Sequence, residues 1–157
     1  MKHQLLIPYF LRTWEQRWYL AAEPDNRHHG ISIFALERME DIKLTENKMQ
    51  PSNKITAEEY FDGSFGVNHS DNQKPEMIRI KVYGAQVEYV RALPIHESQK
   101  EIETTSEWSI FEYRLVPCYN FYQQLLWHRE KLEVIEPLAV REELKSTLQK
   151  ILDHYAK

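Results

Sequence analysis

Residues 78–83 have the sequence Ile-Arg-Ile-Lys-Val-Tyr, and this alternation of apolar with polar or aromatic side chains predicts a half-buried β-strand. Residues 85–93 follow with valines spaced for one face of a helix, so that Val87 and Val90 are expected to point inward. The chain here changes from a period of two to a period of 3.6, which indicates a strand followed directly by a helix.

The next elements complete the pattern that this strand begins. Residues 97–105 predict a polar edge strand, residues 108–116 a strong strand paired with it as a hairpin, and residues 132–136 a short strand. Residues 119–130 between them predict a helix. Its inward face is expected to hold Tyr122, Leu125, Leu126 and Arg129. The order strand-helix-strand-strand-helix-strand is that of the split βαβ, ferredoxin-like arrangement.

A last helix is predicted after Pro137, because proline is tolerated at the start of a helix. Leu144, Leu148 and Leu152 are spaced by four residues and form an apolar stripe. The stripe is widened by Leu138, Ile151 and Tyr155.

The N-terminal part has the composition of short strands. Residues 9–14 and 17–22 are rich in aromatic and branched side chains and predict a hairpin with Glu15-Gln16 as its turn. Residues 24–30, which include His28-His29, predict a loop, and residues 31–38 a third strand that continues toward residues 42–44. Such short strands indicate a small, strongly curved sheet or partial barrel that is incomplete by itself.

The boundary between these parts is placed in a linker at residues 51–75. It contains a short helix at residues 56–61, with Thr56 as its N-cap and Glu58-Glu59 in its first turn. The expected domains are therefore residues 1–50, the linker, and residues 76–157.

Composition limits the possible functions. The 157 residues, 42% hydrophobic and 28% charged, indicate a folded chain of one or two small domains. The net charge of −4 provides no global positive field for duplex DNA or an anionic membrane, so any nucleic-acid contact must be local. Cys118 is the only cysteine, which fits a reducing compartment and a small core residue. No apolar run is long enough for a signal peptide or a membrane span, so a cytoplasmic protein is expected.

Motifs for catalysis or metal binding are not found in the sequence. The seven histidines lack ligand spacing, and the four scattered glycines form no phosphate-binding loop. Carboxylate pairs such as Glu142-Glu143 are expected to lie on solvated helix faces. We therefore expect no enzyme activity, no metal and no cofactor.

An arginine and aromatic cluster is the strongest local feature. Its members within 30 residues are Tyr9, Phe10, Arg12, Trp14, Arg17, Trp18, Tyr19, Phe34 and Arg38. Aromatic rings can stack on bases while guanidinium groups contact phosphates, as in proteins that bind single strands. The alternative is that Trp18, Phe34 and neighbouring leucines are core, with the arginine stems packed at its rim.

Several motifs in order resemble the WYL domain of bacterial transcriptional regulators. They are Pro8-Tyr9-Phe10-Leu11, Arg17-Trp18-Tyr19-Leu20-Ala21 and residues 34–39, followed by connector motifs at residues 59–61 and 64–66. Residues 93–99 and 134–141 resemble the family's C-terminal extension. The resemblance implies an α+β chain: a small Sm-like β-barrel, incomplete here, followed by a ferredoxin-like domain with a C-terminal helix.

The resemblance also implies a role. WYL regions sense a ligand, in some cases single-stranded DNA, and control a helix-turn-helix domain that usually precedes them and is absent from this sequence. Duplex DNA would then be bound only through that missing N-terminal domain. Two departures from the family pattern, Ile7 and Ser32, reduce the expected positive charge of the pocket. The ligand-binding residues expected here are Tyr9, Arg12, Arg17, Trp18, Arg38 and, from the extension, Arg141.

These observations predict the sensing and dimerisation region of a WYL-type regulator, with a nucleotide or single-stranded nucleic acid as ligand. A homodimer is expected because the incomplete barrel and the helix at residues 138–155 both leave apolar surface. Trp18 is expected to be mainly core and Arg17 mainly exposed. The alternative is a structural interaction module that has lost ligand binding.

Overall fold

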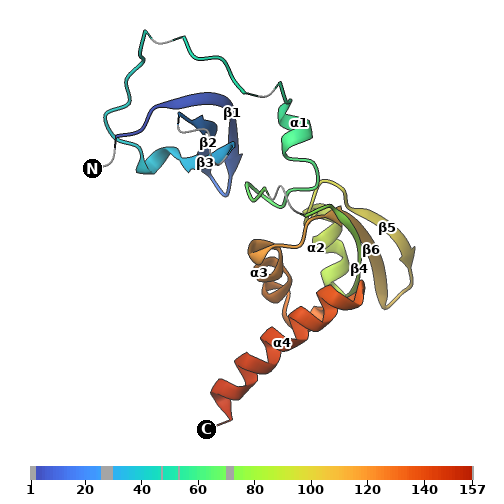
Figure 1. Cartoon of the computed structure of the whole chain (residues 1–157). Coiled ribbons are helices and arrows are strands. Elements are labelled where there is room, and N and C mark those ends of the chain that lie inside the picture. Colours follow the sequence, from blue (N-terminus) through green and yellow to red (C-terminus); the bar gives the residue numbers. More distant parts are fainter. Residues whose placement is uncertain (1–2, 26–29, 47, 53, 70–72, 157) are drawn as a thin grey trace. The chain divides into compact units, whose positions relative to one another are not determined.

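The computed structural model describes residues 3–25, 30–46, 48–52, 54–69 and 73–156. The chain divides into two compact units, Met1–Phe61 and Asp62–Lys157 (Figure 1), and each is described by itself. Both units contain an antiparallel sheet, with three strands in the first unit and four in the second. The expected α+β class is therefore confirmed.

The first unit is built on a three-stranded sheet in the order β1-β2-β3. Its strands are β1 (Leu6–Trp14), β2 (Arg17–Pro24) and β3 (Ser32–Ala35). The predicted hairpin is present, since Trp14 pairs with Arg17 across a two-residue turn. Glu15 and Gln16 have φ of 47° and 64°, and two left-handed residues are what a tight hairpin turn of type I′ needs.

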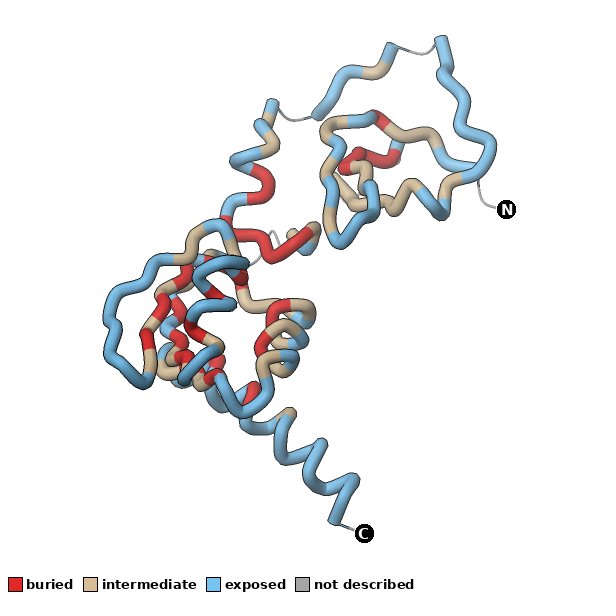
Figure 2. The backbone as a smooth tube through the Cα atoms, turned by 180° about the vertical axis from the view of Figure 1, so that it is seen from behind, coloured by how far each residue is buried: buried red, intermediate tan, exposed pale blue. Residues whose placement is uncertain are grey.

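The third strand is shorter than the sequence predicted. It ends at Ala35 and continues as the 3₁₀ helix η1 (Leu36–Arg38). No strand follows at residues 42–44, where Ile42 and Leu44 are exposed. Figure 2 shows the chain after η1 as mostly exposed. Residues 26–29 of the predicted loop, His28-His29 among them, lie outside the described residues.

The helix α1 (Ala57–Tyr60) covers one face of this sheet. Thr56 is its N-cap, as predicted: the Thr56 hydroxyl accepts a hydrogen bond from the Glu59 amide, and the Glu59 carboxylate accepts one from the Thr56 amide. The hydrogen bond from the Thr56 backbone also holds the pKa of Glu59 below its usual value. The helix carries Tyr60, and the next residue is Phe61; both pack with Ala21 of β2 in a small core.

The second unit has the predicted order of elements. Its strands are β4 (Glu76–Tyr83), β5 (Lys100–Thr104), β6 (Trp108–Leu115) and β7 (Leu132–Glu136), in the sheet order β5-β6-β4-β7. Its helices are α2 (Gln86–Ala92), α3 (Tyr119–Trp127), the 3₁₀ helix η2 (Arg129–Lys131) and α4 (Leu138–Tyr155). All neighbouring strands are antiparallel.

The central strand confirms the alternation that predicted it. Ile78, Ile80 and Val82 are fully buried, and Val87 and Val90 of α2 are buried, as predicted for its inward face. β5 is a fully exposed edge strand, also as predicted.

Two details of the helices differ from the prediction. α3 ends at Trp127 rather than at residue 130, because the left-handed φ of 54° at Arg129 interrupts the α-helical backbone before η2. Its buried residues are Phe121 and Leu125, so the inward face is turned away from the predicted Arg129.

Candidate functional site

The six residues expected to bind a ligand fall into both units. Tyr9, Arg12, Arg17, Trp18 and Arg38 lie in the first unit, and Arg141 lies in the second. The availability of each residue for a ligand depends on what its side chain already contacts.

Tyr9 stands at a bulge in β1, where the pairing with β2 shifts between Pro8 and Phe10. Its hydroxyl donates a hydrogen bond of 2.9 Å to Glu23, whose carboxylate is buried with 1% exposure. The amide and hydroxyl of Ser52 donate to the same carboxylate oxygen, at 3.1 and 2.8 Å. Tyr9 therefore helps to hold a buried charge, since a buried carboxylate needs such donors.

Sequence reasoning did not identify Glu23. The available signal was its position in an otherwise apolar stretch, directly after Leu20-Ala21-Ala22. An acidic residue that continues a buried strand is unusual, and it indicates a hydrogen-bonded internal carboxylate.

Arg12 is partly buried, and its guanidinium lies 4.2 Å from the centre of the Phe61 ring. It is paired with Tyr19 across the hairpin, on the sheet face that also holds Ala21 and the α1 contacts. This cation–π contact joins β1 to the end of α1 and stabilises the unit.

Trp18 is not the core residue that the sequence predicted: its side chain is 54% exposed. Alternation along β2 does place Trp18 and Arg17 on opposite faces, as expected, but the covered face is the one shared by Arg17, Tyr19 and Ala21. Trp18 also lies beyond the end of β3, whose pairing with β2 stops at Tyr19. A tryptophan on the uncovered face beside the turn consequently remains half in solvent.

Arg17 forms an ion pair of 3.3 Å with Glu37 of η1, and both side chains are about half exposed, at 55% and 47%. Arg38 follows Glu37 and is exposed; within the described part of the chain it makes no hydrogen bond or ion pair. η1 packs beside β2. The Arg17–Glu37 ion pair thus joins the start of β2 to η1, and we call these two residues, with their chain neighbours Trp18 and Arg38, the hairpin-tip site.

Tyr9 is not part of this group. About five strand residues separate its position from the turn, which corresponds to about 16 Å along an extended strand. The register of the sheet therefore does not support the expectation that Tyr9, Arg17 and Arg38 contact one ligand together.

Arg141 lies in the first turns of α4 and is bound to β7. Its guanidinium donates to the carbonyl of Val134 at 3.3 Å and pairs with Glu133 at 3.1 Å. Glu133 also accepts a hydrogen bond of 2.6 Å from the Tyr83 hydroxyl, which is the main reason that the pKa of Tyr83 is raised. Arg141 therefore fastens α4 to the sheet.

Three further cations lie on the two central strands of the second unit's sheet, and each of these three has a partner. Arg79 is paired with Glu112 and Glu136, Arg114 with Asp62, and the Lys81 ammonium lies 3.9 Å from the centre of the Trp108 ring. Paired cations attract phosphate weakly. This sheet is consequently a poorer anion site than the hairpin tip.

Two family models match the chain, one in each unit. Residues 3–44 match the model of the WYL domain, and residues 74–152, just over half of the chain, match that of the WCX domain. Among solved structures the chain is similar to proteasome accessory factor B/C (PafBC) of Arthrobacter aurescens, with 15% identity and a TM-score of 0.43. That match covers 98% of this chain and 23% of the other, so this chain spans less than a quarter of the length of that protein.

A search of curated proteins finds no match. Among the residues that the structure describes, no helix has the length and apolar composition needed to span a membrane. WYL and WCX domains are both found in WYL-domain regulators. The chain belongs to the WYL-domain family of transcriptional regulators.

Proposed function

We propose that this chain is the ligand-sensing and dimerisation region of a bacterial, cytoplasmic WYL-type regulator, and that its ligand is a nucleotide or a single-stranded nucleic acid. In this proposal residues 1–50 are a WYL domain of the Sm-like type, residues 51–75 a connector, and residues 76–157 a ferredoxin-like extension. The sheet order β5-β6-β4-β7 with its two crossing helices supports the ferredoxin-like assignment. The role is non-catalytic.

The observation that carries the ligand proposal is an exposed indole, Trp18, and an unpaired guanidinium, Arg38, on the two segments that the Arg17–Glu37 ion pair joins. An exposed indole offers a face on which a base can stack. A guanidinium without an intramolecular partner is available for bidentate contact with phosphate oxygens. Base and phosphate are both present in a nucleotide and in a single strand, so these two groups select that ligand class over a neutral metabolite.

The alternative, a structural module without a ligand, is favoured by the contacts of the other candidates. Tyr9 is bound to Glu23, Arg12 to the Phe61 ring and Arg141 to Glu133. If Arg17 and Arg38 of the hairpin-tip site were also held by contacts within the protein, none of the predicted ligand-binding residues would be left to recognise phosphate.

Fluorescence anisotropy with a short labelled single strand separates the two functions. A sensor should bind it at low salt, and the logarithm of the affinity should fall linearly with the logarithm of the salt concentration, by about 0.7 per phosphate contact. Arg79→Ala is the matched control, because Arg79 is exposed but paired on the second unit. Failure of the unmodified chain to bind at low salt contradicts the ligand proposal and leaves the structural module.

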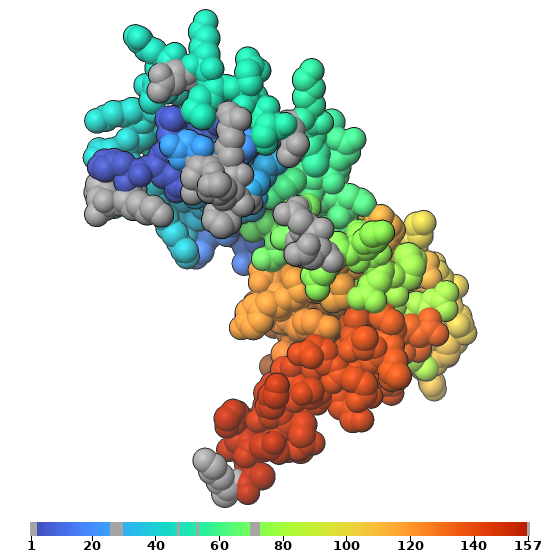
Figure 3. All heavy atoms as spheres, viewed as in Figure 1, coloured from blue at the N-terminus to red at the C-terminus, as the bar shows by residue number. Residues whose placement is uncertain are grey.

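Dimerisation is assigned to α4. Only Val140 and Leu144 are buried, and the later part of the helix extends past the other elements of its unit (Figure 3). Leu148, Ile151, Leu152 and Tyr155 are exposed there, at 49%, 42%, 60% and 82%. Apolar exposure along three turns of an isolated helix is unfavourable in water.

A second copy of α4 fits this stripe. Residues 144, 148, 151 and 155 are separated by four, three and four positions, which is the spacing of a two-helix seam. In an antiparallel pair, Leu148 would meet Ile151 of the partner subunit, and the two bodies would lie at opposite ends of the helix pair. The C2 symmetry of such a pair uses the same surface twice.

A further inference from the structure

The second unit contains a pocket of about 820 Å³ that takes no part in the hairpin-tip site. Three segments form its walls: the beginning of β4, the turn that leads into α3 with the first turn of that helix, and the first turns of α4. Pockets for small molecules have volumes of about 300–1,000 Å³. The pocket is therefore large enough for an organic ligand.

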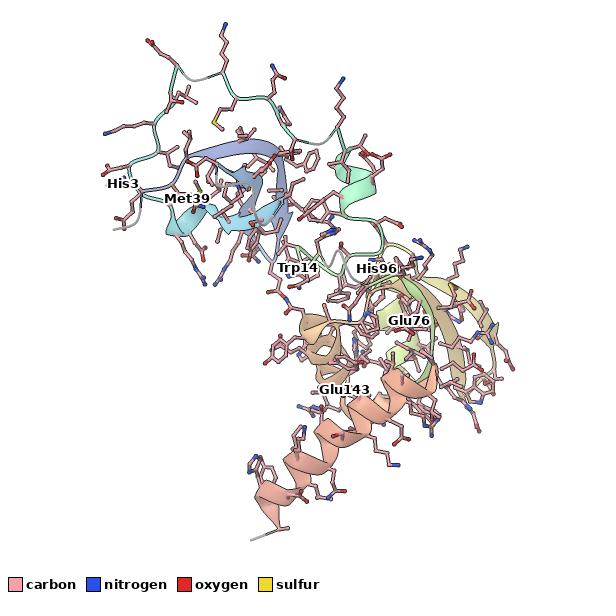
Figure 4. The ribbon with its side chains drawn as sticks, viewed as in Figure 1. His3, Trp14, Met39, Glu76, His96 and Glu143 are labelled. Carbon is pink, nitrogen blue, oxygen red and sulfur yellow. The ribbon has the colours of Figure 1, made fainter. Side chains whose placement is uncertain are left out.

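Two carboxylates from different elements line this pocket. Glu76 comes from β4 and Glu143 from α4, and both are labelled in Figure 4. Neither makes a hydrogen bond or an ion pair with another residue in the described ranges. By contrast, Glu101, Glu112 and Glu133 are paired with arginines. Glu76 and Glu143 are thus two unpaired carboxylates that line the same pocket.

Both charges act on the same part of the pocket. Tyr122 of α3 lines it, and burial together with the negative charges of Glu143 and Glu76 raises the pKa of its phenol. The two carboxylates and Tyr122 line one pocket although the carboxylates are 67 positions apart in the chain. The ring of Tyr119, which is 75% exposed, adds a second aromatic wall.

We propose that this pocket binds an organic cation, namely an ammonium group carried on a small apolar or aromatic body. An ammonium group has three donors and can serve both carboxylates at once. Tyrosine rings attract the same charge through their faces and pack against the apolar body. A neutral ligand would leave the carboxylates uncompensated, and an anionic ligand would be repelled by them.

The chemistry of the walls favours an organic cation over a bare metal ion. Within the described ranges, no three side chains of His, Cys, Asp or Glu are grouped so that they could hold a metal. The volume also greatly exceeds that of one ion. Lys74, which lines the pocket too, is exposed and makes no ion pair with a described residue, so it competes with the ligand without neutralising either carboxylate.

The proposal is tested by NMR titration of the ¹⁵N-labelled full chain with phenethylamine, at constant ionic strength. Phenethyl alcohol and 3-phenylpropionate serve as the neutral and anionic probes of the same shape. Saturable binding is expected for the amine alone, with shifts confined to residues 73–76, 117–122 and 139–143. Equal binding of the alcohol, or no binding of the amine at millimolar concentration, overturns the proposal.

Variants assign the binding to the two carboxylates. Glu76→Gln and Glu143→Gln should each weaken amine binding by about ten-fold or more, the usual effect of losing one charge-assisted hydrogen bond. Glu142→Gln is the matched control, because Glu142 is the neighbouring exposed carboxylate, pairs with Lys145 and lies outside the pocket walls. Lys74→Met should tighten binding. An equal loss in Glu142→Gln would indicate diffuse charge and would refute the site.

Failure of this inference and failure of the proposed function are distinguishable. Glu143→Gln should leave oligonucleotide binding unchanged, and Arg38→Ala should leave amine binding unchanged, since the two residues belong to different units. Thermal melting of each variant establishes that it is folded before its affinity is interpreted.

Discussion

Replacement of Trp18 by alanine should separate stability from ligand binding in this chain. A Trp side chain buries about 150–250 Å² when fully covered. Since 54% of Trp18 is exposed, the covered part is about 70–110 Å², which at about 25 cal/mol per Å² stabilises the fold by about 2–3 kcal/mol as an upper bound. Residual burial in the unfolded chain lowers this to about 1–2 kcal/mol, well below the loss of about 3–5 kcal/mol for a core tryptophan.

The loss of ligand-binding free energy in Trp18→Ala should be similar in size to the loss of stability, but it should arise from the lost stacking of a base. A base stacked on the indole contributes about 1–3 kcal/mol, so Trp18→Ala should weaken single-strand binding by about five-fold to more than a hundred-fold. Trp18→Phe retains a ring on the same uncovered face and should recover most of the affinity while losing part of the packing. Trp18→Ala should thus lower both stability and affinity, whereas Trp18→Phe should lower stability more than affinity.

Urea unfolding and anisotropy, measured on the same preparations, provide both quantities. A loss of more than about 3 kcal/mol in unfolding free energy for Trp18→Ala would mean that the indole is core and that the uncovered face is wrongly assigned. Unchanged oligonucleotide affinity in a folded Trp18→Ala protein would refute the stacking role. Equal affinity loss in Trp18→Phe and Trp18→Ala would contradict recognition through the ring face.

Three further outcomes test other parts of the structure. Arg38→Ala should reduce the slope of log affinity against log salt by about 0.7, as expected for the loss of one phosphate contact to a single strand, and an unchanged slope in anisotropy would exclude that contact. Arg91 holds the pKa of Glu101 at about 2 through a side-chain hydrogen bond, so this pair stabilises the fold above about pH 4.5 and loses its effect as the pH falls toward 2. Glu101→Gln should therefore be less stable than the parent at pH 7 and equally stable near pH 2 in chemical unfolding. Leu148→Glu should give a monomer by light scattering, whereas Ser146→Glu, on the opposite face of α4, should leave the dimer intact; a monomeric parent at tens of micromolar contradicts the α4 interface.

The sequence predicted an element correctly where the spacing of its apolar residues alone determines which residues are buried. Ile78, Ile80 and Val82 alternate because β4 is covered by helices on one side only, and that period is visible without any knowledge of the partners. The hairpin turn and the Thr56 cap are likewise decided within a few residues. The third strand was predicted too long because Leu36 continues the apolar stretch that begins at Ile31, yet the backbone of residues 36–38 turns into η1 beside β2.

The face of a strand that becomes core depends on residues far along the chain. β2 could bury either Trp18 and Leu20 or Tyr19 and Ala21, and hydrophobicity favours the first pair. The decision lies with Tyr60 and Phe61, about forty positions later, which pack on Ala21. A hydrophobicity scale cannot predict this choice of face, because it scores each side chain by itself and contains no information about the residues that pack against it.

The pocket of the second unit could not be predicted from spacing either. Its walls come from three separate segments, and Glu143 differs from its neighbour Glu142 only in which side of α4 it occupies. The sequence assigned both to a solvated face, which is the usual outcome for adjacent acidic residues on a helix. Only the packing of α4 beside α3 and β4 distinguishes them.

The number of arginines in a sequence is a weaker guide to phosphate binding than the cost of releasing each one. Arg17 is paired, but with an exposed carboxylate, and such a surface ion pair contributes about 0–1 kcal/mol. A phosphate that displaced Glu37 would offer charge-assisted hydrogen bonds of about 1.5–3 kcal/mol in return. Arg12 could be released only by uncovering the Phe61 ring, and Tyr9 only by leaving the buried Glu23 carboxylate with one donor fewer. Releasing Tyr9 or Arg12 from its contacts therefore costs more than releasing Arg17 from its exposed ion pair. Any phosphate recognition by the first unit is consequently expected at the hairpin-tip site.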